Sequence, residues 1–305
     1  MNAVDVQHLT HSYGQRVALT DLTLQVAPGE VFGLLGPNGS GKTTLFRILS
    51  TVIPPPPGIV KVFSRDIATE QAAVRSLIGV VFQSPSLDKQ LTARENLIHH
   101  GHLYGLRGAA LKSRVAESLR AFGLSDRARE RVATFSGGMR RRVEVAKGLL
   151  HRPRLLLMDE PSTGLDPAAR LDLWSLLEEV RRQGVSVLLT THLMEEADRC
   201  HRLAILEQGR LLACDTPAAL KSQVGGEVIV ISSRDVDRLR QVVAEKLGWS
   251  TDLVDGNLRI EMADAHLAVP RIIEAAPGLV ESISVGKPTL EDVFIRATGR
   301  SLAVN

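Results

Sequence analysis

Residues 36–43 read Gly36-Pro37-Asn38-Gly39-Ser40-Gly41-Lys42-Thr43 and set the architecture of this 305-residue chain. The segment fills the GxxxxGK[ST] template of a phosphate-binding loop. The apolar run Val31–Leu35 precedes it and residues 44–49 continue in a helical pattern, so we expect a buried strand that feeds a helix. In that setting the glycines let consecutive backbone N–H groups converge on phosphate oxygens at a positive helix N-terminus. The sequence therefore predicts a nucleotide site.

The phosphate loop and a second motif divide the predicted chemistry between them. Lys42 would reach the β- and γ-phosphates, and the Thr43 hydroxyl would ligate Mg²⁺. The second motif is the apolar run 155–158, which ends in two carboxylates. Asp159 can hold Mg²⁺ through water, and Glu160 can polarise a water for attack on the γ-phosphate. We expect the nucleotide to contact Gly36, Pro37, Asn38, Gly39, Ser40, Gly41, Lys42, Thr43 and Thr44.

The rest of the first 222 residues predicts an α/β body. Apolar and polar positions alternate in residues 4–9 and 22–26, which indicates short antiparallel strands. Residues 155–158, 167–183 and 185–190 are expected to form a strand, a helix and a strand, an order that implies a parallel sheet. The helical spacing of apolar residues between Leu91 and Leu150 predicts a helical insert at about residues 85–150.

The composition changes after Gln223, where Gly225-Gly226 marks a hinge. Residues 227–285 then follow a β-α-β-β-α-β order, in which the second strand is expected over residues 249–254. This order predicts a small split βαβ domain of the α+β class. A closing helix is expected at residues 289–297. We therefore expect two domains, a nucleotide-binding domain at residues 1–222 and an accessory or regulatory domain at residues 223–305.

Charge and hydropathy bear on whether the chain binds nucleic acid or crosses a membrane. Lys and Arg total 37 against 34 Asp and Glu, a balance that does not favour a nucleic-acid partner, and we expect none. The run Arg140-Arg141-Arg142 has acidic neighbours such as Glu144, so we expect a solvated helix face there. No uncharged apolar run approaches the roughly 18 residues that cross a bilayer. Taken alone, these features predict a soluble cytoplasmic chain.

Between the two nucleotide motifs lies Phe135-Ser136-Gly137-Gly138-Met139, which resembles the signature sequence of ATP-binding cassette (ABC) ATPases. Many members have Leu and Gln where this chain has Phe135 and Met139. The other motifs of that family occur in the family order over residues 1 to about 222. They are Tyr13, expected on the turn after the first strand, as the adenine-stacking aromatic, Gln83 as the Q-loop, Ser162-Thr163-Gly164-Leu165-Asp166 as the D-loop and Thr190-Thr191-His192 as the switch.

The resemblance implies a role for each matching residue, on a P-loop NTPase fold with a parallel sheet, an antiparallel β subdomain and a helical insert. Gln83 would read Mg²⁺ and the attacking water, and His192 would bond the γ-phosphate. The implied catalytic residues are Lys42, Gln83, Glu160 and His192, and the implied Mg²⁺ ligands are Thr43, Gln83 and Asp159. The further nucleotide contacts are Tyr13, Ser136, Gly137, Gly138 and Asp166. The signature is expected to act across a dimer of cassettes, closing over ATP held by the other chain.

The tail and the Q-loop continuation indicate a subfamily. Residues 286–294 resemble the ending of the daunorubicin-resistance-type drug exporter ATPases, and the LD…LT..ENL pattern of those proteins is echoed in residues 87–97. This resemblance implies export of a drug or antibiotic through separate membrane-spanning subunits, at the cytoplasmic face of the cell membrane. Exporters of sodium, polysaccharide or lipo-oligosaccharide have similar cassettes. A soluble ABC ATPase that acts on ribosomes or DNA is a further alternative.

Overall fold

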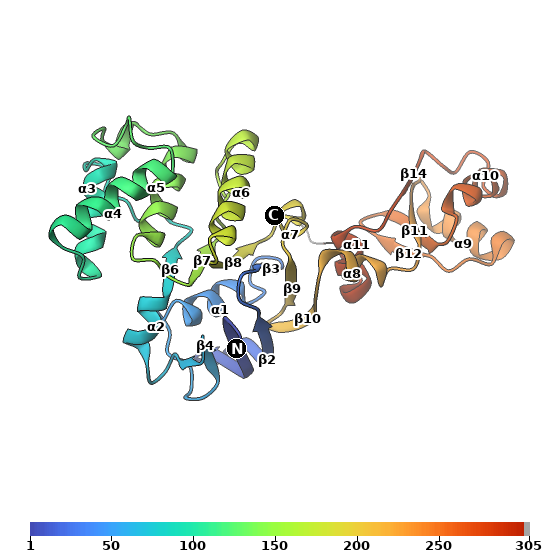
Figure 1. Cartoon of the computed structure of the whole chain (residues 1–305). Helices are drawn as coiled ribbons and strands as arrows, with labels where there is room; N and C mark the ends of the chain where they lie inside the picture. Colours follow the sequence, from blue (N-terminus) through green and yellow to red (C-terminus); the bar gives the residue numbers. More distant parts are fainter. Residues whose placement is uncertain (302–305) are drawn as a thin grey trace.

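Three sheets organise the computed structural model, which describes residues 1–301 (Figure 1). The first sheet is antiparallel and contains the strands that alternation predicted. In spatial order it consists of β2 (Arg16–Val26), β1 (Val4–Tyr13), β4 (Val60–Val62) and β5 (Arg65–Asp66). Its inward-facing residues, among them Val4, Val6 and Leu24, enter a core shared with the helix that follows the phosphate loop.

The central sheet is largely parallel, as the strand–helix–strand order predicted. Its strands are, in spatial order, β10 (Arg210–Asp215), β9 (Arg202–Glu207), β3 (Val31–Leu35), β8 (Ser186–Thr191), β7 (Leu155–Asp159) and β6 (Ile78–Val81). Neighbouring strands run parallel except for β10, which is antiparallel to β9. The helices α1 (Lys42–Leu49), α6 (Pro167–Arg182) and α7 (Met194–Ala197) connect or follow these strands.

Helices on both faces of the central sheet explain why its strands are continuously apolar. Successive side chains of a strand point to opposite faces. Leu155 and Leu157 of β7 enter one core with Phe46 of α1, whereas Leu156 enters a second core with Leu177 of α6. A strand buried on both faces has no position for a polar side chain until it ends.

The helical insert packs along one side of the central sheet (Figure 1). It follows α2 (Gln71–Leu77) and β6, and it contains α3 (Ala93–Leu103), α4 (Gly108–Ala121), the short 3₁₀ turn Val132–Thr134 and α5 (Gly137–Leu149). Apolar residues such as Leu97 and Val115 join the second core, to which Val143 of α5 also belongs. The predicted insert is therefore confirmed.

The residues after α8 (Pro217–Ser222) form the predicted β-α-β-β-α-β unit. Its antiparallel sheet has the order β12 (Asp252–Val254), β13 (Asn257–Met262), β11 (Glu227–Ser232) and β14 (Ser282–Gly286). The helices α9 (Val236–Leu247) and α10 (Ala265–Ala275) pack on this sheet around a core of its own, which includes Ile229 and Ile272. This unit lies on the opposite side of the central sheet from the helical insert (Figure 1).

The last helix, α11 (Leu290–Thr298), returns to the first 222 residues. Phe294 shares a core with Leu35 of β3 and Leu220 of α8. The Arg300 guanidinium then pairs with Glu207 at the end of β9. Arg300 and Ser301 line a cleft of about 460 Å³ whose opposite wall is residues 37–40 of the phosphate loop. Residues 302–305 of the predicted accessory domain lie outside the described part of the chain.

No helix within residues 1–301 combines the length and the apolar composition that crossing a membrane requires.

Candidate nucleotide site

Four loops meet at the carboxyl edge of the central sheet, because parallel strands all end at the same edge. The phosphate loop follows β3, and Gln83 follows β6. Glu160 follows β7, and His192 follows β8. The structure therefore brings together the residues that lie far apart in the sequence and that we predicted to be catalytic.

The phosphate loop has room only for glycine at two of its positions. A β-carbon on Gly36 would come within 2.2 Å of the Leu206 carbonyl oxygen. Gly41 has a φ of 104°, and a β-carbon there would come within 2.7 Å of the Leu19 side chain. The Ser40 hydroxyl is buried and has no hydrogen-bond partner within residues 1–301, which fits a loop built to receive phosphate oxygens.

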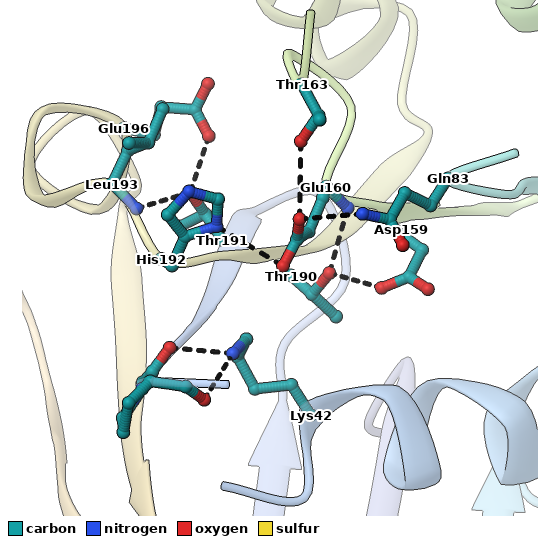
Figure 2. A network of polar contacts seen from close by, with 12 residues as sticks. Lys42, Gln83, Asp159, Glu160, Thr163, Thr190, Thr191, His192, Leu193 and Glu196 are labelled. Atoms are coloured by element: carbon teal, nitrogen blue, oxygen red, sulfur yellow. Dashed lines mark hydrogen bonds and ion pairs between the residues drawn. The ribbon is translucent and has the colours of Figure 1, made fainter. Parts of the chain in front are cut away.

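Lys42 already points into the loop that precedes it (Figure 2). Its Nζ donates to the carbonyl oxygens of Gly36 at 2.7 Å and Pro37 at 2.9 Å. Burial lowers the pKa of Lys42, and the nearby carboxylates of Glu160 and Asp159 act in the opposite direction. The ammonium group is thus held at the base of the loop, where a triphosphate would be bound.

A cleft of about 420 Å³ opens in front of this loop. Its lining includes Tyr13, Asn38, Gly39, Gly41, Lys42, Thr43, Thr44 and Glu160. Tyr13 is the last residue of β1, not part of the following turn as we expected, and 46% of it is exposed. An aromatic face at the rim and a positive loop at the base fit a nucleoside triphosphate.

The two carboxylates at the end of β7, Asp159 as its last residue and Glu160 directly after it, lie in different surroundings (Figure 2). Asp159 is buried and accepts a hydrogen bond of 2.6 Å from the Thr190 hydroxyl, and burial raises its pKa. The carboxylate of Glu160 accepts hydrogen bonds from Gln83 Nε2 at 3.0 Å and from the Thr163 hydroxyl at 3.3 Å. The His192 Nδ1 lies 3.3 Å from Glu160 Oε1, close enough for an ion pair with protonated imidazole, but it is not aligned as a hydrogen bond.

Two threonines of β8 orient this site, and we did not assign them individual roles from the sequence. Thr190 Oγ1 donates to Asp159 and accepts the backbone N–H of Glu160 at 2.9 Å. The Thr191 hydroxyl donates to Glu196 at 2.6 Å and accepts the Leu193 N–H at 3.0 Å, which fixes both sides of His192. Two consecutive buried hydroxyls at the end of an apolar strand are the signal that indicates such a role.

The residues predicted to hold Mg²⁺ fit that ion by their chemistry. Thr43, Gln83 and Asp159 all offer oxygen atoms, the ligands that Mg²⁺ prefers, and Mg²⁺ usually keeps several waters and phosphate oxygens. No group of three or more His, Cys, Asp or Glu residues within 1–301 could hold a metal ion.

The signature residues lie at a different cleft. Ser136 caps α5 by accepting the Met139 N–H at 3.2 Å, and Asp166 caps α6 by accepting the Ala169 N–H at 2.9 Å. With Gly138 they line a cleft of about 310 Å³ between the two helix starts, and Gly137 lies beside Leu165. None of these signature and D-loop residues lines the phosphate cleft of the same chain.

The prediction that residues 140–142 form a solvated face is wrong for Arg141. This side chain is buried and pairs with Glu144 at 2.9 Å. Arg141 lies on the inner face of α5 one turn before Glu144, so its charge is satisfied inside the protein. Arg142, in contrast, pairs with Asp172 in an accessible position.

Comparison with known proteins agrees with the family that the sequence motifs resemble. The family model described as "ABC transporter" matches residues 19–163. The Nod factor export ATP-binding protein I of Paraburkholderia xenovorans (strain LB400) is 39% identical to this chain, over 98% of each. The daunorubicin resistance ATP-binding protein DrrA3 of Streptomyces coeruleorubidus is 38% identical, over 97% of this chain and 96% of its own length.

A solved structure supports the fold. It is cbiO1 from Clostridium perfringens, part of the ABC transporter complex cbiONQ, which aligns with a TM-score of 0.68 over 81% of this chain and 96% of its own. Its sequence is 24% identical, so the likeness concerns the fold alone.

Proposed function

This chain belongs to the ABC transporter family as an ATP-binding and ATP-hydrolysing subunit, and we propose that it drives export of a drug or antibiotic through separate membrane-spanning subunits. The observation that carries the proposal is the length of the similarity. Relatives named for daunorubicin resistance and for Nod factor export match 97% and 98% of this chain, so the similarity extends through the accessory unit after residue 222. The proposed place of work is the cytoplasmic face of the cell membrane.

The residues at the carboxyl edge divide the hydrolysis step among them. Lys42 stabilises the negative charge of the β- and γ-phosphates, and Tyr13 stacks on the adenine ring. Glu160 orients and polarises the attacking water, with Gln83 and His192 positioned on either side of its carboxylate. When bound, Mg²⁺ neutralises phosphate charge, and Thr43, Gln83 and Asp159 would hold it.

We further propose that two chains pair to complete each site. Ser136 and the glycines of the signature stand at the start of α5 and line a cleft separate from their own phosphate loop. A helix N-terminus with an exposed hydroxyl suits the γ-phosphate of a nucleotide held by a second chain. ATP bound at both shared sites then favours the closed dimer, and hydrolysis favours the open one, which biases the membrane subunits.

The experiment is an efflux assay in cells that lack their own drug exporters. The chain is expressed with and without the permease of a neighbouring reading frame, and retention of fluorescent daunorubicin is measured. We expect low retention and recovery of the chain in membranes only when both proteins are present. Lys42→Ala is the matched variant and should restore high retention at equal expression. Recovery with ribosomes or DNA, independent of the permease, would contradict the exporter.

A second candidate cargo has one observation in its favour. The Nod factor export relative is as similar to this chain as the daunorubicin resistance relative. If the chain and its permease reach the membrane and hydrolyse ATP but leave daunorubicin retention unchanged, a secreted lipo-oligosaccharide becomes the cargo to assay.

A further inference from the structure

Three charged side chains are buried on one face of α5. Arg141, Glu144 and Lys147 are spaced three residues apart, and their exposed fractions are 5%, 3% and 9%. Charges are rarely buried unless each finds a partner, because desolvation is costly. Arg141 donates to Glu144 at 2.9 Å, which pairs two of the three. We call these three residues the α5 clamp.

The α5 clamp forms hydrogen bonds to both ends of the loop after β6, residues 82–86. Arg141 Nη1 donates to the Phe82 carbonyl oxygen at 3.3 Å. On the far side, Glu144 Oε1 accepts the Ser86 N–H at 2.9 Å, and Lys147 Nζ donates to the Ser86 carbonyl oxygen at 3.0 Å and to its hydroxyl. The backbone of residues 82–86 is therefore bonded to one helix face before and after residue 83.

Gln83 is the residue held between these two attachments. Its Nε2 donates to the Glu160 carboxylate at 3.0 Å, across a long separation in sequence. Its own side chain lies in an accessible position, so this contact depends on where the backbone of the loop is placed. The same helix begins at Ser136, whose hydroxyl caps it. A shift of α5 as a rigid element would therefore move the Gln83 backbone with it.

We propose that Arg141, Glu144 and Lys147 are positioning residues for ATP hydrolysis, which hold the Gln83 loop so that Gln83 stays on Glu160. This inference rests on the roles proposed above for Gln83 and Glu160. The contacts of the clamp involve neither the phosphate loop nor the adenine-stacking position, so its main effect is expected on the hydrolysis step and not on nucleotide affinity.

The decisive variant is Lys147→Met, which keeps most of the side-chain length, removes both bonds from Lys147 to Ser86 and leaves Glu144 paired with Arg141. We expect kcat for ATP hydrolysis by the full chain to fall roughly tenfold to a hundredfold, the scale of a small misplacement of a catalytic group, with KM for ATP unchanged. Lys147→Arg should recover most of the turnover. Glu178→Gln removes a half-buried i,i+3 pair with Arg181 on α6, away from the Gln83 loop, and is the control that should turn over like the parent chain.

A double variant separates positioning from general damage. If the clamp acts through Gln83, Lys147→Met combined with Gln83→Ala turns over no more slowly than Gln83→Ala alone. Rates that multiply, or a fall in ATP affinity with unchanged kcat, would overturn the inference. If Gln83→Ala itself hydrolyses ATP normally, the proposed role of Gln83 is wrong. The clamp then cannot affect hydrolysis through Gln83.

Amide hydrogen exchange can test whether the clamp holds the Gln83 loop, and it does not depend on ATP hydrolysis. In Lys147→Met the amides of residues 82–84 and 86 should exchange faster than in the parent, whereas those of the phosphate loop should not change. Arg141→Met, which removes the bond to the Phe82 carbonyl oxygen at the other end of the loop, should give the same result if Lys147→Met does not fold. Unchanged exchange of residues 82–86 in the folded variant would show that the clamp does not hold the loop.

Discussion

Glu160 has a left-handed backbone, with φ at 43°, which is uncommon for a residue with a side chain. Such a conformation costs about 1–3 kcal/mol and persists only where the surroundings enforce it. The Thr190 hydroxyl does so here by accepting the Glu160 N–H, while Thr163 and Gln83 hold the carboxylate. The side chain proposed to orient water is thus fixed from both the backbone and the tip.

This fixation makes Glu160→Gln a sharp test at the residue scale. The amide keeps the size of the side chain but no longer polarises water, so hydrolysis should fall by at least about a hundredfold. ATP binding should remain, because Lys42 and the loop are untouched, and a nucleotide-dependent dimer should accumulate. ATP turnover and gel filtration with ATP measure the two effects. Normal turnover would remove Glu160 from its proposed role.

The sequence predicted the site better where a motif fixes a position than where packing does. Lys42, Asp159 and His192 were placed from short motifs that follow strands, and they converge because parallel strands end at one edge. Arg141 could not be placed in this way. Its burial depends on Glu144 and on the Phe82 carbonyl of a distant loop, and a run of arginines in sequence does not show which one has such partners.

At the scale of elements, α3 and the end of α5 meet through a group of rings. Tyr104 and His151 stack with their centroids 3.7 Å apart, and His100 lies 5.1 Å from Tyr104. Burial lowers the pKa of His100 to about 4 from the usual 6.5, and the charges of Lys147 and His151 act in the same direction. The folded structure around His100 therefore favours the neutral imidazole.

The consequence is a loss of stability in acid. The unfolded chain binds a proton at His100 near pH 6.5, whereas the folded chain binds it only near pH 4, so lowering the pH through that window favours unfolding. His100→Phe keeps an aromatic ring and removes the titration. We expect its melting temperature to gain on that of the parent as the pH falls from 6.5 towards 4. His99→Phe, at an exposed position of α3, is the control and should follow the parent.

Sequence patterns predicted long elements and missed the limits of short ones. Apolar periodicity placed α6 and the strands β3, β7 and β8 within one or two residues. In the accessory unit a strand was expected over residues 249–254, but β12 begins only at Asp252. A three-residue edge strand buries little, so its start is decided by pairing with β13 and not by its own composition.

At the scale of the whole molecule, the division at residue 222 remains a proposal, and the cores show how to test it. Ile272 lies in the core of the small sheet, whereas Phe294 lies in a core with Leu35 and Leu220. A buried charge contact also joins the two regions, since Arg259 of β13 pairs with Asp292 of α11 at 3.1 Å. The sequence hinge at residues 225–226 marks where the chain leaves the cassette, but nothing in the pattern shows that α11 returns to it.

Two truncations of buried side chains should therefore have different effects. Ile272→Ala and Phe294→Ala each remove a core side chain, at a cost of about 2–5 kcal/mol. Ile272→Ala should loosen residues 227–286 to proteolysis while the melting shift induced by ATP stays as in the parent. Phe294→Ala should lower the stability of the nucleotide-binding part and reduce that shift. Equal effects of the two variants would indicate a single cooperative core.

Because the end of the described chain returns to the phosphate loop, a fluorescent label placed there could report nucleotide binding. Ser301 lies at the cleft whose far wall is residues 37–40, so a dye attached there would sit beside the nucleotide. The chain has two cysteines, Cys200 and Cys214, and burial raises the pKa of both thiols, which makes them poor nucleophiles. Ser301→Cys should thus be labelled selectively, and its fluorescence should follow the binding and release of ATP in real time.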